Sequence, residues 1–310
     1  MKLTTKRLPP WLKKRLPRPQ ETAPVLEALR ELRLATVCQE AQCPNRGECF
    51  ARGTATFMIL GRTCTRRCTF CAVGKGKPAP PDPDEPQRVA EAAVRLGLRH
   101  VVVTGVTRDD LPDGGSMQFA RTILAVRRRS RATVEVLTPD FKGQARHIDR
   151  VAEARPDVFN HNVETVPRLY GAVRPGADYA RSLALLERVA GRGLLTKSGL
   201  MLGLGERQDE VGQVLADLRA AGCRAVTLGQ YLRPSPEHHP VVEFLPPARF
   251  EELGRIAEVM GFEAVASGPF VRSSYNAGLM AARLLERAPV ARSGHGTQVR
   301  AAGPRRRRAR

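Results

Sequence analysis

Six of the seven cysteines in this 310-residue chain fall in two tight groups near its N-terminal end. A structural zinc site typically takes four protein ligands, in pairs about two to four residues apart. An iron–sulfur cube also has four corners, so a set of three cysteines leaves one iron open to a substrate or to another residue. Two such sets therefore predict two [4Fe–4S] clusters that take part in chemistry. The first triad is Cys38-x4-Cys43-x5-Cys49 and the second triad is Cys64-x3-Cys68-x2-Cys71.

The residues around the cysteines disfavour two simpler roles, those of ordinary core thiols and of disulfide partners. Ordinary core thiols would be scattered through apolar strands, whereas these lie among Pro, Asn, Gly, Arg and Thr. An odd number of cysteines, bunched near one end, fits a reducing cytosol better than a disulfide framework. The basic N-terminal stretch lacks the apolar region of a secretory signal, and no apolar run reaches the roughly eighteen residues of a membrane span. We therefore expect a cytoplasmic protein without a membrane partner.

Apolar runs alternate with helical patterns from residue 54 onward. The runs lack clean in–out alternation, which is typical of parallel strands buried on both faces. Six strand–helix units and a late extra strand are fewer than the eight units of a closed barrel. The pattern predicts an α/β fold, an open partial (β/α)6 TIM-type barrel with a cysteine-rich N-terminal extension and a C-terminal extension. The expected strands cover 54–61, 99–105, 133–138, 157–163, 195–202, 225–231 and 262–267, and the expected helices 86–96, 116–129, 143–154, 178–191, 208–221 and 247–260.

The formal net charge of +20 is concentrated at the two ends of the chain. Residues 1–20 and 288–310 each hold seven Lys or Arg and no acid, and their composition predicts disorder. The run Arg305–Arg308 lacks the interleaved aromatics of a nucleic-acid contact, so a solvated tail is favoured and nucleic acid is not an expected partner. The predicted segments are 1–20, a disordered basic segment; 21–53, the extension that carries the first triad; 54–261, the partial barrel; 262–287, the C-terminal extension; and 288–310, a disordered Arg-rich tail.

The second triad, read as Cys64-Thr-Arg-Arg-Cys68-Thr-Phe-Cys71, resembles the cluster-binding signature of the radical S-adenosylmethionine (SAM) superfamily. It directly follows the first expected strand, where three thiolates can reach three corners of one cube. The resemblance implies that SAM chelates the fourth iron. It also implies that SAM is cleaved to a 5′-deoxyadenosyl radical, which abstracts hydrogen from an unactivated carbon. Phe70, just before the last cysteine, can shield this cluster.

Polar residues at the C-terminal ends of the expected strands are candidates for SAM contacts, because that edge is the active face of barrel enzymes. Asn160 and Asn162 share one strand face with Glu164, so all three could meet a ribose or a substrate, although a hydrogen-bonded strand end is an alternative. The stretch from Gly199 to Glu206 resembles the superfamily's adenine-packing element, but a strand–turn–helix junction would also use its glycines. The candidate cofactor-binding residues are Phe70, Thr104, Asn160, Asn162, Glu164 and Glu206.

A larger set of motifs, in one order, resembles the lipoyl synthase family from about residue 24 to residue 280. The set combines a cysteine triad upstream of the SAM-type triad with a terminal Arg-Ser-Ser-Tyr. Its members are Thr36-Val-Cys-Gln-Glu-Ala-Gln-Cys-Pro-Asn-Arg-Gly-Glu-Cys-Phe50, Gly53-Thr-Ala-Thr-Phe-Met-Ile-Leu-Gly61, Arg108-Asp-Asp-Leu-Pro-Asp-Gly-Gly115, Asp157-Val-Phe-Asn-His-Asn162, Val173-Arg-Pro-Gly-Ala-Asp178, Thr196-Lys-Ser-Gly-Leu200 and Gly268-Pro-Phe-Val-Arg-Ser-Ser-Tyr275.

This resemblance implies a specific reaction, the insertion of two sulfur atoms at C6 and C8 of an octanoyl chain that is amide-linked to a lysine of a carrier protein. The carrier is a lipoyl carrier domain or the glycine-cleavage carrier protein, and two SAM molecules are used per lipoyl group. The resemblance makes Cys38, Cys43 and Cys49 ligands of an auxiliary [4Fe–4S] cluster that supplies the sulfur, with Ser274 as fourth ligand. A hard oxygen suits a corner that must come apart. By pattern alone, the serine would belong to a turn or helix cap before Asn276.

The same resemblance implies two further partners, a low-potential electron donor of the ferredoxin or flavodoxin type and a carrier that repairs the auxiliary cluster. Two other classes of protein remain open. A methylthiotransferase usually adds an RNA-binding β-barrel, for which the residues after 280 are too few. A zinc-bearing nucleic-acid-binding protein would fit the basic ends but not the triads or the 5% of aromatic residues. Iron–sulfur cubes are brown and zinc is colourless, so a visible spectrum of protein purified without oxygen separates these classes.

Overall fold

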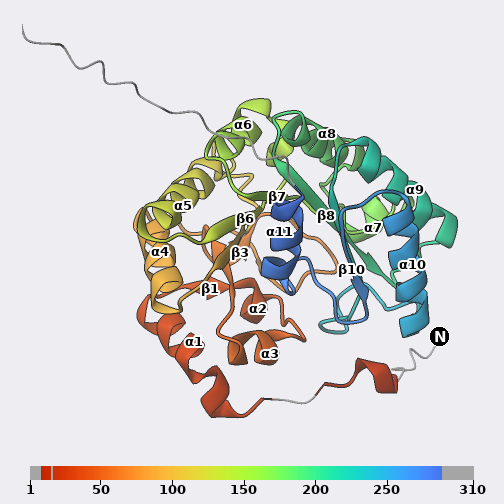
Figure 1. Ribbon diagram of the computed structural model, residues 1–310, viewed down its shortest axis with the longest axis horizontal. Coiled ribbons are helices and arrows are strands. Elements are labelled where there is room, and N and C mark those ends of the chain that lie inside the picture. Colours follow the sequence, from red (N-terminus) through yellow and green to blue (C-terminus); the bar gives the residue numbers. More distant parts are fainter. Residues whose placement is uncertain (1–7, 15–16, 288–310) are drawn as a thin grey trace, which may run out of the picture.

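The strands form one open, curved sheet with helices on its outer side (Figure 1). The computed structural model describes residues 8–14 and 17–287. Within these residues the sheet has the order β1-β2-β5-β6-β7-β8-β9-β10, and every pair is parallel except β1 with β2. Its two edge strands do not pair with each other, so the predicted open partial barrel is confirmed. The strands are β1 (Ala35–Thr36), β2 (Thr56–Ile59), β5 (His100–Gly105), β6 (Thr133–Leu137), β7 (Val158–Asn160), β8 (Leu195–Leu202), β9 (Ala225–Gln230) and β10 (Ala264–Gly268).

The main helices cover the outside of the sheet, close to the ranges that the sequence predicts. Alternate residues of each strand face them, so Val101 and Val103 of β5 share one buried apolar cluster with Val89 and Ile123 of two flanking helices. None of the described helices combines the length and the apolar character that a membrane crossing requires. The outer helices are α4 (Glu85–Arg95), α5 (Ser116–Arg129), α6 (Ala145–Glu153), α8 (Tyr179–Ala190), α9 (Gln208–Ala220) and α10 (Pro247–Val259).

One end of the barrel, where the strands begin, carries α2 (Val37–Glu40), α3 (Arg46–Ala51) and α11 (Ala277–Glu286) (Figure 1). Met280 and Leu284 of α11 are buried against the first residues of the last four strands. Helix α11 therefore closes the half of this end that β7 to β10 form. These first strand residues are Val158, Leu195, Ala225 and Ala264.

The opposite end is built by the loops that follow the strands. Residues 60–76 form the loop after β2, which we call the cluster loop because it contains the second triad. The first triad precedes β2, so the two triads lie at opposite ends of a four-residue strand, about 13 Å long at the usual rise per residue. The short elements at this end are β3 (Thr63–Cys64), β4 (Gly74–Lys75), η2 (Phe141–Gly143), η3 (Pro167–Leu169) and α7 (Tyr170–Val173).

Contacts between distant parts of the chain join the N-terminal extension to the segment after β10. Asn45 donates from Nδ2 to the carbonyl oxygen of Phe270, 225 residues away, at 2.6 Å. The Tyr275 hydroxyl donates to Glu48 Oε1 at 2.8 Å. Lys14 Nζ donates to Glu48 Oε2 at 2.6 Å and lies 4.5 Å from the centre of the Phe270 ring. The two ends of the described chain thus form one structural unit.

These contacts fix part of the N-terminal segment 1–20, which the sequence predicts to be disordered. Residues Pro10–Leu12 form a 3-10 turn (η1), and α1 (Pro19–Glu31) begins before residue 20. Lys14 is fixed by partners that lie far along the chain, which a local composition pattern cannot reveal. The remaining residues of that segment, 1–7 and 15–16, and the Arg-rich tail 288–310 lie outside the described residues.

A buried ion pair lies inside the barrel, between its two ends. Lys197 Nζ of β8 donates to Glu135 Oε1 of β6 at 2.8 Å, and both side chains are at most 1% exposed. Asn160 donates to the same oxygen at 3.3 Å, and His100 Nε2 lies 3.4 Å from the other oxygen. Although burial alone would raise it, the nearby charge of Lys197 holds the pKa of Glu135 below its usual value. The charges of Lys197 and Glu135 therefore neutralise each other inside the barrel.

Removing one partner of this pair should be costly, because it leaves an uncompensated buried charge. We expect Lys197→Met to lower the free energy of unfolding by about 3–5 kcal/mol. The double variant Glu135→Gln/Lys197→Met removes both charges and should recover most of the loss. Urea unfolding, followed by circular dichroism, measures both changes. Unfolding of Lys197→Met at the same urea concentration as the parent would show that the pair does not carry this energy.

Candidate functional site

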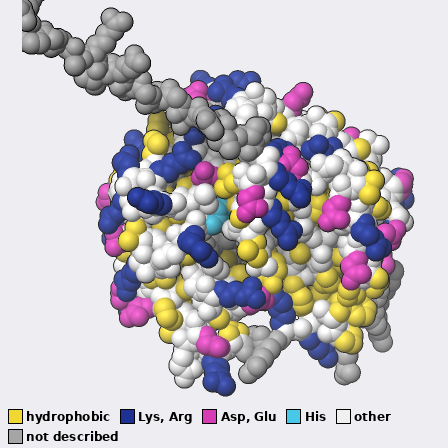
Figure 2. Space-filling model, viewed as in Figure 1, with side chains coloured by type: hydrophobic (Ala, Val, Ile, Leu, Met, Phe, Trp, Pro, Cys, Tyr) yellow, Lys and Arg dark blue, Asp and Glu magenta, His cyan; other side chains and the backbone are white. Residues whose placement is uncertain are grey.

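The first triad lines a cavity of about 640 Å³ at the end of the barrel where the strands begin. Figure 2 shows it as a hollow near the middle of this face. Cys38 lies in α2 and Cys49 in α3, with Cys43 in the turn between them. Thr36 fixes the start of α2, because its hydroxyl accepts from the Gln39 N–H at 3.3 Å. The strand residues in the wall include the first residues of three strands, Thr56, His100 and Thr133.

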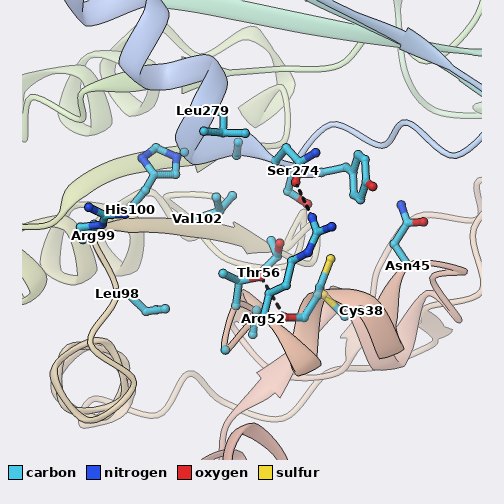
Figure 3. A pocket seen from close by; sticks show the side chains of 18 of the residues that line it. Cys38, Asn45, Arg52, Thr56, Leu98, Arg99, His100, Val102, Ser274 and Leu279 are labelled. Carbon is cyan, nitrogen blue, oxygen red and sulfur yellow. Dashed lines mark hydrogen bonds between the residues drawn. The ribbon is translucent and has the colours of Figure 1, made fainter. Parts of the chain in front are cut away.

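Ser274 reaches the same cavity from the segment after β10. In Figure 3 it faces Arg52 and Cys38 across the opening. The segment runs so close to β9 that a Cβ atom at Gly229 would lie 2.0 Å from the carbonyl oxygen of Val271, so a glycine is required there. The structure therefore brings all four donors predicted for the auxiliary site to one cavity.

The second triad is held at the opposite end by a buried ion pair. Arg66, between the first two cysteines of the cluster loop, donates to both oxygens of Asp109 at 2.8 and 3.1 Å. It also donates to Asp140, in the loop after β6, at 2.6 Å. Although burial raises it, the hydrogen bond and charge of Arg66 bring the pKa of Asp140 down to about 2. Asp140 is therefore ionised at neutral pH, and the pair ties the cluster loop to its neighbours.

Two histidines hold another side of the cluster loop. The His239 N–H donates to the carbonyl oxygen of Thr69 at 2.9 Å, and His238 Nε2 lies 3.1 Å from the carbonyl oxygen of Cys71. Both histidines belong to the long segment after β9. The side chain of Gln230, the last residue of β9, bonds to backbone groups near both ends of that segment. The segment after β9 thus connects the end of β9 to the cluster loop.

Burial raises the pKa of four thiols in the two triads. It raises the pKa of Cys49 and of Cys71 to about 12, and it raises the pKa values of Cys38 and Cys68 above the usual range. Charges on other cysteines of the same triad add to each rise, so the three thiols of a triad lie close enough to influence one another. Iron binds thiolates, so cluster binding must displace the protons of these thiols.

Lowering the pH should therefore weaken cluster binding. We expect the loaded protein to lose its visible absorbance to an iron chelator faster at about pH 6 than at about pH 8, because protons compete with iron for the thiolates. The control variant Cys223→Ser removes a buried thiol outside both triads and should behave as the parent does. Equal rates of iron loss at the two pH values would contradict this expectation.

Two buried amide oxygens face the barrel interior without a hydrogen-bond partner among the described residues, Asn160 Oδ1 and Asn162 Oδ1. Carboxylates orient both amides, since Asn160 donates to Glu135 at 3.3 Å and Asn162 donates to Glu164 at 3.0 Å. A Cβ atom at Gly199 would lie 3.1 Å from Asn162 Oδ1, so the glycine leaves this oxygen room. Buried acceptors normally have donors. These two oxygens are thus available to the hydroxyl or N–H groups of a ligand.

The other predicted cofactor-binding residues lie where the strands end. Thr104 Oγ1 donates to a carbonyl oxygen of β6 at 3.0 Å. The Glu206 carboxylate accepts from the N–H groups of Gly203 at 2.5 Å and Leu204 at 2.9 Å, so it shapes the turn after β8. Phe70 packs against a small buried cluster that includes Leu204. Whether these three residues touch SAM stays a prediction.

Sequence reasoning did not single out three residues that the structure places beside the second triad: Arg66, Arg174 and His238. Arg174 Nη1 donates to the carbonyl oxygens of two residues after β7 at 3.0 Å, and its buried Nε has no hydrogen-bond partner among residues 8–14 and 17–287. Single arginines carry little signal in a chain with 51 Lys and Arg. Two signals in the sequence could have identified these residues. Arg66 lies between two cysteines, and His238 is adjacent to another histidine.

The donor chemistry fits iron–sulfur clusters. Each triad supplies three soft sulfur ligands from free cysteines, and the cavity at the first triad is also lined by Ser274. Among the described residues, no three His, Cys, Asp or Glu side chains form a site for a single metal ion.

The fold and the second triad define a class of enzyme. Residues 58–218 match the radical SAM superfamily. Two solved structures share the fold at low sequence identity. HydG, a maturase of the [FeFe]-hydrogenase, aligns with a TM-score of 0.54 at 11% identity and covers 86% of this chain and 74% of that chain. SuiB of Streptococcus suis aligns with a TM-score of 0.53 at 12% identity and covers 68% of this chain and 48% of that chain. The protein is a radical SAM enzyme.

Its relatives narrow that class to one family. Residues 1–43 match the N-terminal domain of lipoyl synthase. The lipoyl synthase of Caldanaerobacter subterraneus subsp. tengcongensis is 58% identical over 284 residues, which cover 90% of this chain and 99% of that protein. The lipoyl synthase of Methylococcus capsulatus is 57% identical over 280 residues, with 89% and 87% covered. The chain belongs to the lipoyl synthase family, and the resemblance drawn from its motifs is confirmed.

Proposed function

We propose that this enzyme inserts two sulfur atoms at C6 and C8 of a protein-bound octanoyl-lysine and so produces protein-bound lipoyl-lysine. It is a radical SAM sulfurtransferase. The observation that carries the proposal is the placement of two cysteine triads at opposite ends of one barrel, with Ser274 at the cavity of the first triad. The methylthiotransferase and zinc-protein alternatives lose their support, because the closely related proteins are lipoyl synthases over most of their length.

Two [4Fe–4S] clusters and SAM are the cofactors that this function needs. When bound, SAM and its cluster supply the 5′-deoxyadenosyl radical, and the auxiliary cluster supplies the sulfur. Each radical removes one hydrogen, so two SAM molecules serve one lipoyl group. The second triad leaves one corner for SAM, whereas Ser274 would close the auxiliary set. The ligands that we propose are Cys64, Cys68 and Cys71 for the SAM-binding cluster, and Cys38, Cys43, Cys49 and Ser274 for the auxiliary cluster.

The residues around the interior would bind and orient SAM and the substrate. The free amide oxygens of Asn160 and Asn162 can accept from ribose hydroxyls, and Glu164 holds the second amide in place. Arg66 fixes the cluster loop through its two aspartates. The proposed cofactor-binding set also includes Phe70, Thr104 and Glu206, which lie at the end of the barrel where the strands finish.

The proposed partners follow from the reaction and from the family. The substrate is an octanoylated lipoyl carrier domain or the glycine-cleavage carrier protein. Reduction of SAM needs a low-potential donor of the ferredoxin or flavodoxin type, and a sulfur-donating cluster needs a carrier that repairs it. Seven free cysteines suit the reducing cytoplasm, which we propose as the location.

Replacing each triad separately tests the division of labour. The variant in which Cys64, Cys68 and Cys71 are all replaced by Ala should contain half the iron and should not cleave SAM. The variant in which Cys38, Cys43 and Cys49 are all replaced by Ala should also contain half the iron. It should still produce deoxyadenosine but no thiolated product. Iron analysis and mass spectrometry of an octanoylated carrier peptide measure these outcomes. SAM cleavage by the first variant, or two clusters in the second, would refute the assignment.

Replacing Ser274 tests the fourth auxiliary ligand. Ser274→Ala should leave SAM cleavage intact but strongly impair sulfur insertion, and Ser274→Cys should slow sulfur release because a soft thiolate holds iron more firmly. Ser273→Ala is the matched control and should be far milder, because the adjacent side chain does not line the cavity. Single-turnover assays of deoxyadenosine and of mono- and dithiolated product compare the three variants. Normal dithiolation by Ser274→Ala would leave the fourth ligand unassigned.

A further inference from the structure

The outer surface of the cluster loop is basic. Residues 60–77 contain five Lys or Arg and no Asp or Glu. Two of the five are neutralised by carboxylates, Arg62 by Glu40 and Arg66 by the two aspartates described above. The other three are exposed, and among the described residues none of them has a carboxylate within ion-pair distance. These three are Arg67, Lys75 and Lys77.

The two short strands of the cluster loop bring this surface close to the second triad. Strand β3 pairs with β4 in parallel, and the register sets Lys75 opposite Cys64. Neighbouring strands lie about 4.8 Å apart. The Gly76 N–H also donates to the carbonyl oxygen of Cys64 at 3.1 Å. All residues from 74 to 77 are exposed, so β4 lies at the surface, one strand spacing from a proposed cluster ligand.

Other sides of the second triad are covered. Arg66 joins the cluster loop to the loops after β5 and β6. His238 and His239, in the segment after β9, contact the carbonyl oxygens of Cys71 and Thr69. Under the proposed function, SAM occupies the open corner that faces the barrel interior. The ribbon of β3 and β4 is therefore an outer side of this site that remains accessible to a partner protein.

Neighbouring charges extend the basic character of this side. Lys142 Nζ donates to the carbonyl oxygen of Asp109 at 3.1 Å, and the Asp109 N–H donates to a threonine hydroxyl of the cluster loop at 3.1 Å. Asp109 and Asp110 do not oppose this charge, because buried arginines are hydrogen-bonded to both carboxylates. We use the name basic surface for the four exposed cations Arg67, Lys75, Lys77 and Lys142.

We propose that the electron donor docks on the basic surface, and that this donor is a small redox protein with an acidic surface around its redox centre. The inference rests on the proposed function, which needs one electron for each SAM that is cleaved, and it assigns the contact surface and the charge of the partner. The donor loses one electron across β4, and the cluster at the second triad gains it; no bond forms or breaks and no proton moves in this step. Electron transfer slows steeply with distance, so an approach beside Cys64 suits it, and cations without carboxylate partners attract an acidic protein.

Cross-linking tests where the donor docks. A carbodiimide joins carboxylates to lysine amines that they contact, and the chain has only eight lysines. With an acidic plant-type [2Fe–2S] ferredoxin as the probe, we expect cross-links at Lys75, Lys77 or Lys142. Lys13 is the internal control, because it is exposed and precedes Lys14 near the first triad. Cross-links confined to Lys13 or to other residues outside the basic surface would refute the proposal.

Reversing the charges tests the role in electron transfer. The double variant Lys75→Glu/Lys77→Glu, loaded with its clusters, should oxidise reduced ferredoxin about tenfold or more slowly at low salt, and the difference should fade at high salt. Freeze-quench EPR measures the rate as the loss of the [2Fe–2S] signal. The matched control is Arg121→Glu/Arg255→Glu, at exposed positions on the outer helices α5 and α10. Equal rates for the two double variants would overturn the proposal.

Dithionite, a small reductant that needs no docking surface, separates this inference from other failures. With dithionite, the double variant should match the parent in iron content and in deoxyadenosine formation. Lys77→Glu alone, outside β4, should slow the ferredoxin reaction in the same direction. A loss that also appears with dithionite would assign these lysines to the cluster itself and refute the docking surface. If the parent forms no thiolated product with dithionite, the proposed function fails, and the cross-links still decide where the ferredoxin docks.

Discussion

The common direction of the strands is the constraint on which the site depends. Because β2 and the strands that follow it in the main sheet run parallel, the segment before β2 and the loop after it must lie at opposite ends of the barrel. Cys49 and Cys64 are separated by a single four-residue strand, so the triads cannot merge into one site. A substrate that meets both sites must be long and narrow. An acyl chain on a lysine arm has that shape.

The two triads are held by different kinds of contact. The cluster loop is tied by Arg66 to a buried aspartate that stays ionised, and such a pair is costly to break. The segment that carries Ser274 is instead held by hydrogen bonds to the N-terminal extension, from Asn45 to Phe270 and from Tyr275 to Glu48. Under the proposed function, the loop with the buried ion pair would hold the cluster that is kept, and the hydrogen-bonded segment would close the cluster that is consumed.

The sequence predicts the elements of the barrel and the two triads well, because both leave local signals. Apolar runs and helical periodicity report on nearby residues, and cysteine spacing is unusual by itself. Long-range contacts leave no such signal. Lys14 lies in a stretch whose composition predicts disorder, yet its partners are Glu48 and Phe270. Glu135 and Lys197 stand within runs whose apolar character predicts strands, and their mutual neutralisation becomes visible only once β6 and β8 face one interior.

The origin of the sulfur tests the central claim most directly. The chain is loaded with iron and heavy-isotope sulfide, and free sulfide is removed. It then reacts once with SAM, a reductant and an octanoylated lipoyl domain, with ordinary sulfide in solution. Mass spectrometry of the product reads the label. The account predicts the heavy isotope at both C6 and C8, and no labelled product from the variant that lacks the first triad. Product that contains only ordinary sulfur from solution would contradict the assignment of the auxiliary site as the sulfur source.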